Sequence, residues 1–276
     1  MNPSLFLGVK RNRILLYIIL VVTFLVTVVA TGLYLDEDSI ATNLQHRNLA
    51  PSLEHYFGTD WLGRDMFSRT LMGLSLSMGV GLTGALASTF IAVVLGMIAA
   101  TLGKVADGIV SWLIDLFLSV PHLVTLILIA FSFGGGMKGV VIGIALTHWP
   151  SLARIIRAEV LQIRTADYVQ VSKKLGKSRW WIATRHVFPH IIPQMLVGFL
   201  LMFPHAILHE AAVTFLGLGL SSHEPAIGII LSESMKYLSS GYWWLAFFPG
   251  LCLLFVVRAF DFVGENLQTL FYSNRS

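Results

Sequence analysis

The sequence predicts an all-α, polytopic membrane protein with six transmembrane helices. Its 276 residues are 55% hydrophobic and only 12% charged, and their mean hydropathy is +0.75. Soluble domains carry about 25% charged residues, so this chain has too few to cover a water-facing surface. A helix needs about 20 apolar residues to cross a bilayer. Six stretches meet that requirement: 14–35, 71–102, 107–133, 138–160, 190–216 and 243–264.

Charge and cysteine content narrow the class further. The net charge of +4 does not indicate a nucleic-acid-binding protein, because the basic residues cluster beside apolar stretches, where they hold loops on the cytoplasmic side. Cys252 is the only cysteine, so neither an intramolecular disulfide nor a cysteine metal cluster can form. No pattern in the chain predicts a cofactor.

The first apolar stretch is expected to be a retained transmembrane helix. Lys10, Arg11 and Arg13 precede it, as they would precede a signal peptide, which is the alternative. The apolar part runs from Ile14 to Leu35. That length exceeds a signal-peptide core, and no small-residue cleavage site follows, so retention is the better interpretation.

The distribution of basic residues predicts the orientation in the membrane. Loop 36–69 contains six acidic residues against three arginines, which favours the outer side. Segment 154–187 contains eight basic residues against Glu159 and Asp167, which is the strongest cytoplasmic signal in the chain. Six spans then place both termini in the cytoplasm and the loop at 220–242 outside.

The basic loop is predicted to contain a short amphipathic helix over residues 167–175. Gly176 follows it, as glycine commonly follows a helix C-terminus, and a second helical stretch is expected over 179–186. The apolar face of the first helix contains Tyr168, Val171 and Leu175. Such a helix between two spans is a rigid attachment point for a partner; an ordinary interfacial helix is the alternative.

The motif DYVQVSKKLG (167–176), followed by HVFP (186–189), resembles the coupling loop of ABC importer permeases, usually written E-A-A-x-x-x-G. Gln170, Val171 and Ser172 stand where that family has Glu-Ala-Ala, and Gly176 matches its glycine. The contact with the ATPase that an acidic residue usually makes in this family would here be made either by Gln170 or by Asp167. The residues it implies as contacts with the ATPase are Asp167, Tyr168, Gln170, Ser172 and Gly176.

Five further blocks, in the same order, are similar to the dipeptide, oligopeptide and nickel branch of that family. They are FGTDWLGRDMFSR (57–69), TFLGLGL (214–220), PAIGIIL (225–231), WWLAFFPG (243–250) and FDFVGENL (260–267). Ile227, where tryptophan is common, and Glu265, where aspartate is common, depart from the branch pattern.

The resemblance implies a type I ABC importer permease fold in a bacterial inner membrane. Residues 1–70 would form an N-terminal transmembrane helix and an outward loop, and residues 71–276 a core domain with its coupling loop at 161–189. The subunit would not be an enzyme, because separate subunits hydrolyse ATP. The implied partners are a second permease subunit, two ATP-binding subunits and an extracytoplasmic substrate-binding protein.

Two partial motifs are better explained without catalysis. Gly176-Lys177-Ser178 ends like a phosphate-binding loop, but position 171 is valine instead of the required glycine. His209-Glu210 begins a zinc-protease motif, but the second histidine is replaced by Val213.

The fifth span carries the candidate metal-binding residues. His205 and His209 are four residues apart and share one helix face, and Glu210 lies about 100° further round. Two imidazoles directed into a pore, with Glu210 near its rim, suit a transition metal; hydrogen bonding to neighbouring helices is the alternative. The resemblance favours a metal substrate, since nickel permeases of this branch have histidines at the positions of His205 and His209. Peptide permeases usually lack these histidines but commonly have the glutamate that matches Glu210.

The sequence therefore leads to the hypothesis of nickel- or cobalt-type metal import, either as a free ion or as a metallophore complex. A dipeptide or oligopeptide permease is the alternative within the branch. An ATP-independent secondary transporter or channel is the alternative from another class, although the chain shows no inverted repeat. In the third and fourth spans, Asp115 is expected to form a structural ion pair with Arg154 or Arg157.

Overall fold

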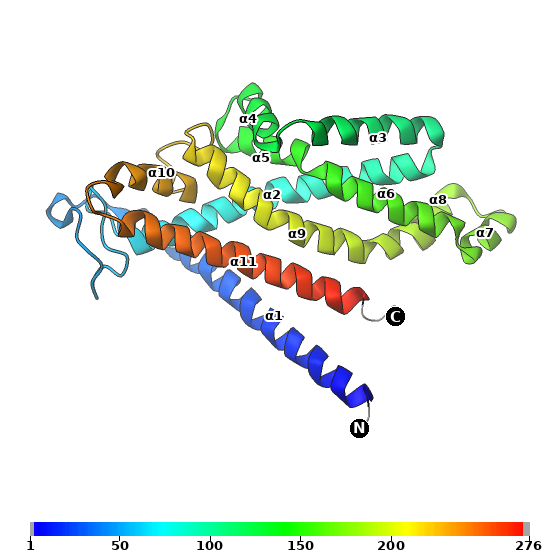
Figure 1. Ribbon diagram of the computed structural model, residues 1–276, viewed down its shortest axis with the longest axis horizontal. Coiled ribbons are helices and arrows are strands. Elements are labelled where there is room, and N and C mark those ends of the chain that lie inside the picture. The colour runs from blue at the N-terminus through cyan, green and yellow to red at the C-terminus, as the bar shows by residue number, and fades with distance from the viewer. Residues whose placement is uncertain (1–2, 273–276) are drawn as a thin grey trace.

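The computed structural model describes residues 3–272, with side chains for 12–36, 38–178 and 180–271. These residues form an elongated helical bundle (Figure 1), which confirms the predicted all-α class. The α-helices are α1 (Pro3–Tyr34), α2 (Met66–Thr101), α3 (Lys104–Ser119), α4 (His122–Ser132), α5 (Gly136–Thr147), α6 (Trp149–Thr165), α7 (Asp167–Lys174), α8 (Arg179–Ile182), α9 (Phe188–Phe215), α10 (Ile227–Leu238) and α11 (Trp244–Tyr272). Short 3-10 turns cover Glu37–Ile40 and Leu44–His46, and a π-helical turn covers Ala183–Val187.

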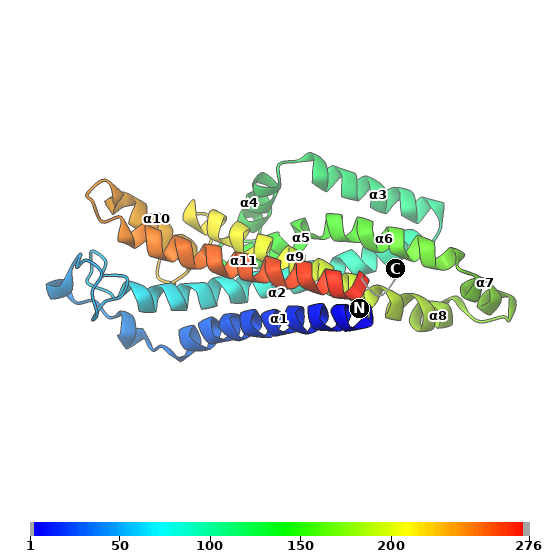
Figure 2. The ribbon, with the colours of Figure 1, turned by 60° about the horizontal axis from the view of Figure 1, so that its bottom comes forward.

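Five helical segments are long and apolar enough to cross a membrane, and α3 with α4 forms a sixth candidate. α2 runs through the middle of the bundle and packs against α1, α5, α6 and α9. α1 and α3 lie on opposite edges in both views (Figures 1 and 2). α7 and α8 extend beyond one end, and α10 and the segment between α1 and α2 form the other.

A stripe of small residues lets α2 approach its neighbours closely. The stripe recurs every four residues and consists of the buried Gly84, Ser88, Ala92, Gly96 and Ala100. A Cβ atom on Gly84 would lie 2.7 Å from the side chain of Ile144 in α5, and one on Gly96 would lie 2.9 Å from the backbone oxygen of Ala153 in α6. Small residues at this spacing are typical of membrane helix contacts, where close packing replaces the hydrophobic effect.

We expect Gly96→Leu to destabilise the bundle by about 1–3 kcal/mol, because the added side chain must separate two backbones. The measurement is the midpoint of thermal unfolding of the detergent-solubilised protein. Gly79→Leu is the matched control, since a Cβ atom at Gly79 in the same helix meets nothing within 4 Å. Equal midpoints for the two variants would contradict the close-packing argument.

The prediction of one continuous helix over 107–133 is wrong. α3 and α4 meet at an angle of 101°, with Val120 and Pro121 between them. Proline lacks an amide hydrogen and disfavours helical geometry at the residue before it. Val120 accordingly has extended backbone angles (φ −97°, ψ 141°). The break turns α4 toward α5, against which it packs, and Gly139 makes the contact possible because a Cβ atom there would lie 2.4 Å from the oxygen of Ala130.

The segment between α1 and α2 is held by buried charges. Asp60 is completely buried and accepts hydrogen bonds from Arg64 Nε (2.7 Å) and Arg69 Nη1 (2.8 Å). Arg69 also donates from Nη2 to Glu233 Oε2 in α10, at 2.9 Å. The ring of Trp61 stacks on Tyr237 of α10 with centroids 4.8 Å apart. The GTDWLGRDMFSR block thus joins this loop to the start of α2 and to α10.

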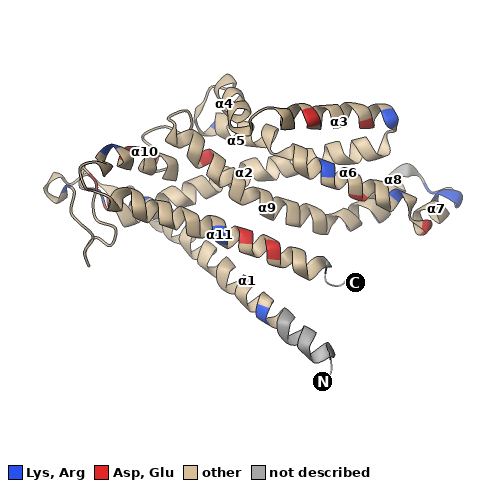
Figure 3. Cartoon of the chain, in the orientation of Figure 1, with Lys and Arg blue, Asp and Glu red and all other residues tan. Residues whose placement is uncertain are grey.

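Basic residues gather toward the end of the bundle that holds α7 and α8 (Figure 3). α1 begins and α11 ends toward that same end (Figures 1 and 2). The start of α1, the end of α11 and the basic loop thus lie toward the same end of the bundle.

Candidate functional site

A half-open cavity of about 450 Å³ lies where α3, α4, the α5–α6 junction, α6, α9 and α11 contribute side chains, and several of its lining residues are exposed on the surface of this chain. Leucine, isoleucine, valine and methionine form its apolar wall, and no aspartate or glutamate lies among its described lining residues. Its polar lining includes Thr147, Ser151, Gln194 and Gln268, and four histidines: His122, His148, His205 and His209.

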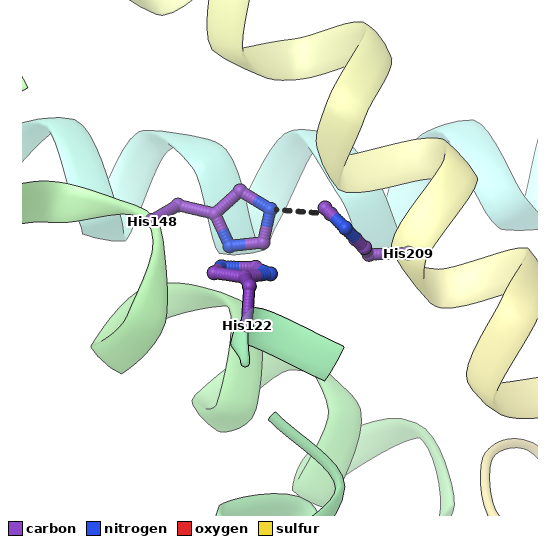
Figure 4. Close-up of side chains that lie close together, drawn as sticks. All are labelled: His122, His148 and His209. Atoms are coloured by element: carbon purple, nitrogen blue, oxygen red, sulfur yellow. Dashed lines mark hydrogen bonds between the residues drawn. The ribbon is translucent and has the colours of Figure 1, made fainter. Parts of the chain in front are cut away.

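Three of these histidines, from three different helical segments, form a compact cluster (Figure 4). His122 is the first residue of α4, directly after the break at Pro121. His148 lies between α5 and α6, and His209 is in α9. One nitrogen from each ring can be chosen so that all three atoms lie within 4.8 Å of one another. His148 Nε2 and His209 Nδ1 are 3.1 Å apart.

Hydrogen bonds determine the tautomer of His148. Its Nδ1 atom lies 3.1 Å from the carbonyl oxygen of Ile144 and 3.1 Å from the hydroxyl oxygen of Thr147. The Thr147 hydroxyl donates to the oxygen of Gly143 at 2.8 Å, so it accepts from His148. Since both neighbours are acceptors, Nδ1 carries the hydrogen and the lone pair of Nε2 points toward His209.

The structure separates the three residues that the sequence grouped in the fifth span. His205 and His209 both line the cavity, as their four-residue spacing suggested, but His205 lies outside the three-imidazole cluster. Glu210 does not lie at the rim of the cavity. It is completely buried, where it accepts a hydrogen bond from Thr214 (2.9 Å) and lies beside Ser77 of α2. Because Glu210 lies about 100° further round α9 than His209, its side chain faces α2 instead of the cavity.

The sequence-based reasoning missed His122 as a neighbour of His148 and His209. A straight helix over 107–133 gives no reason for His122 to approach the fifth span. The available signal was Pro121, which breaks that helix one residue earlier.

The expected ion pair between the third and fourth spans is present. Arg154 Nη2 donates to Asp115 Oδ1 at 2.9 Å, with both side chains exposed. Arg157 instead pairs with Asp107, to which Nη2 donates at 2.7 Å. These two bridges join α6 to α3.

The loop between α6 and α9 contains the predicted short helix, α7 (Asp167–Lys174). Gly176 follows with φ +73°, a left-handed geometry that glycine adopts without steric cost. Val169 is completely buried and anchors α7. The apolar face predicted from the sequence is exposed to 46% at Tyr168, 54% at Val171 and 71% at Leu175.

The residues expected to contact an ATPase differ in whether their side chains are exposed or hydrogen-bonded within the loop. Asp167 and Tyr168 are exposed on α7. The Gln170 amide donates to the oxygen of Arg164 at 2.7 Å, and the Ser172 hydroxyl lies 2.9 Å from His186 Nε2. In this conformation, Gln170 and Ser172 therefore stiffen the loop, while Asp167 is the exposed acidic group on α7.

Comparison with known proteins places the chain in a family. Residues 92–272 match the family model of the binding-protein-dependent transport system inner membrane component. The chain is 33% identical over 260 residues to the dipeptide transport system permease protein DppC of Bacillus subtilis, covering 94% of this chain and 81% of the relative. It is 35% identical over 265 residues to a putative peptide permease protein of Brucella suis, covering 95% and 87% respectively. The chain therefore belongs to the binding-protein-dependent inner membrane components, which are the permease subunits of ABC importers.

Proposed function

We propose that this chain is one of two permease subunits of an ATP-driven importer in a bacterial cell membrane, and that its cargo is a short peptide or peptide-like molecule. The observation that carries the proposal is the exposed apolar face of α7 at the basic end of the bundle, on a loop anchored by Val169 and capped by Gly176. One of the two ATP-binding subunits would bind this loop, and residues 71–276 would form the core of the translocation path.

The distribution of charge supports an orientation with α7, α8 and both chain ends in the cytoplasm. The loop that contains Asp60 and Trp61 then faces outward, where a substrate-binding protein would deliver cargo. ATP-driven movement of the α7–α8 loop would be transmitted to α6 and α9, the spans it connects, and would open the cavity alternately to each side.

The relatives are dipeptide and putative peptide permeases, which favours a peptide over the nickel-type cargo inferred from the histidine pair. The cavity is compatible with a peptide, because hydroxyl, amide and imidazole groups can hydrogen-bond to peptide bonds while the apolar wall contacts side chains. Import of a transition-metal complex is the second candidate, and the observation in its favour is the clustering of three imidazoles.

The proposal is tested by reconstituting the complete complex in proteoliposomes with its binding protein and measuring uptake of a radiolabelled dipeptide. We expect uptake to require ATP and all the partner subunits, and excess unlabelled dipeptide to abolish it. Vesicles that contain this chain alone are the control. Uptake by those vesicles without ATPase subunits would contradict the importer proposal and favour a secondary transporter.

Competition by nickel or cobalt separates the two cargo candidates. If the dipeptide travels without metal, nickel or cobalt salts should leave its uptake unchanged. Metal-dependent dipeptide uptake would favour a metal complex as the cargo.

A further inference from the structure

We propose that Arg164 is a positioning residue that links α7 to α2, so that ATP-driven movement of α7 displaces α2 as a rigid body. The inference rests on the proposed importer function and deepens it. The chain itself joins the α7–α8 loop to α6 and α9, whereas α2 lies far from this loop in the sequence. Movement of α7 can therefore reach α2 only through contacts between side chains and backbone.

Arg164 lies in the last turn of α6 and is hydrogen-bonded to two other helices. Its guanidinium Nη1 donates to the backbone oxygen of Ala100, one of the last carbonyl groups of α2. Its own backbone oxygen accepts a hydrogen bond of 2.7 Å from the side-chain amide of Gln170 in α7. This residue therefore contacts the end of α2 with its side chain and α7 with its backbone.

Both hydrogen bonds are made by carbonyl groups at helix ends. The last four carbonyls of a helix have no partner within the helix, and the C-terminal end carries a partial negative charge. The cationic guanidinium of Arg164 supplies a donor and the opposite charge at the end of α2. The Gln170 amide supplies a donor at the end of α6 in the same way. Neither link disturbs a hydrogen bond inside a helix.

Apolar packing holds α7 at the same place. Val169 of α7 is completely buried and belongs to the same buried apolar cluster as Ile163 of α6 and Ala100 of α2. α7 packs against α6, and α6 packs along α2. The ends of α2 and α6 are thus joined to α7 by packing as well as by hydrogen bonds.

α2 is better suited than α9 to carry a movement across the bundle. It continues without a break for 36 residues and contains no proline, which gives a rod about 54 Å long. α9 follows a π-helical turn at Ala183–Val187 and contains Pro193 and Pro204. Helices bend at such turns and prolines, so a displacement of the loop would be partly absorbed there.

The opposite end of α2 is joined to the outer segments. Arg69, in the first turn of α2, pairs with Asp60 at 2.8 Å and with Glu233 of α10 at 2.9 Å. A displacement of α2 at Arg164 would therefore reach the loop that faces the substrate-binding protein. Arg164 thus gives the ATPase subunits a direct connection to the outer end of the bundle.

The first test compares transport with ATP hydrolysis in proteoliposomes that contain the complete complex and its binding protein. Arg164→Met removes the donor and keeps a long side chain. We expect this variant to bind the ATPase subunits and to hydrolyse ATP, but to take up at least about fivefold less radiolabelled dipeptide per ATP. Arg164→Lys should recover part of the loss, because it keeps a cationic donor for the single hydrogen bond to Ala100.

Arg157→Met is the matched control. Arg157 lies about two turns earlier in α6 and pairs through its guanidinium with Asp107 of α3 instead of with α2. A general loss of helix packing should affect both methionine variants, but only Arg164→Met should lower the ratio of uptake to hydrolysis. A wild-type ratio in Arg164→Met, or an equal fall in both variants, would overturn the role of Arg164.

A distance measurement tests the rigid link directly and does not depend on the cargo. Spin labels are attached through Lys173→Cys in α7 and Leu102→Cys directly after α2, both at exposed positions, in a Cys252→Ser background. Pulsed electron paramagnetic resonance gives the distance between the labels in the nucleotide-free complex and with a non-hydrolysable ATP analogue. We expect the two states to give the same distance when Arg164 is present and different distances in Arg164→Met.

The outcomes separate this inference from the importer proposal. A distance that changes with nucleotide while Arg164 is present would overturn the rigid link, as would an unchanged distance in Arg164→Met. Failure of the ATPase subunits to co-purify with the wild-type chain would instead contradict the importer proposal on which the inference rests.

Discussion

The double variant Val171→Asp, Leu175→Asp is expected to abolish ATP-driven uptake while the chain still inserts into the membrane. Both side chains are largely exposed on α7, so the substitutions do not disturb the packing of this subunit. In the proposed complex the same side chains are covered by an ATPase subunit. Two carboxylates would then be desolvated without partners, which costs about 2–6 kcal/mol and corresponds to a loss of affinity of about 30-fold or more.

The measurements are co-purification of the ATPase subunits and transport in proteoliposomes. Lys173→Asp is the matched control, because it changes the net charge by the same two units on the same helix but away from the apolar face. We expect this control to retain most of the co-purification. If the double variant binds the ATPase subunits as well as the control does, α7 is not the coupling surface.

Arg69→Ala is expected to destabilise the protein by about 3–5 kcal/mol, because it breaks a buried ion-pair network. Arg69 is 2% exposed and bridges Asp60 of the loop between α1 and α2 to Glu233 of α10. Without it, the ion pairs of Glu233 with described residues are reduced to the 3.5 Å contact to Arg64. Asp60, which is completely buried, loses one of its two guanidinium partners.

The measurement is the midpoint of thermal unfolding, together with proteolysis of the loop at 36–65, which should become faster. Arg69→Lys keeps the positive charge but lacks the planar guanidinium that reaches both acids. Its unfolding midpoint should therefore fall between those of the wild type and Arg69→Ala. Arg258→Ala removes an exposed bridge to Asp261 and should cost at most about 1 kcal/mol. Equal effects of Arg69→Ala and Arg258→Ala would show that the network is not structural.

Local rules explain why parts of the candidate site were predictable. α7 was predictable because its apolar spacing and Gly176 are adjacent in the chain. The Asp115–Arg154 bridge was predictable because charges in apolar spans must find partners. His205 and His209 both line the cavity because helical spacing puts residues four apart on the same face of α9.

Glu210 shows where such reasoning stops. Helical geometry gives the angle between Glu210 and His209, but the identity of the helix that each one faces depends on packing. α2 approaches Glu210 through Ser77, so a carboxylate expected at a pore rim is buried instead.

The sequence by itself determined the membrane class, the approximate extents of most spans and the short helix of the basic loop. These features depend on bilayer thickness, on charge and on contacts between residues close in the chain. Only the tertiary structure decided that the segment over 107–133 bends by 101° and brings His122 to His148 and His209. A proline indicates where a helix can break, but the direction of the new helix depends on the neighbours against which it packs.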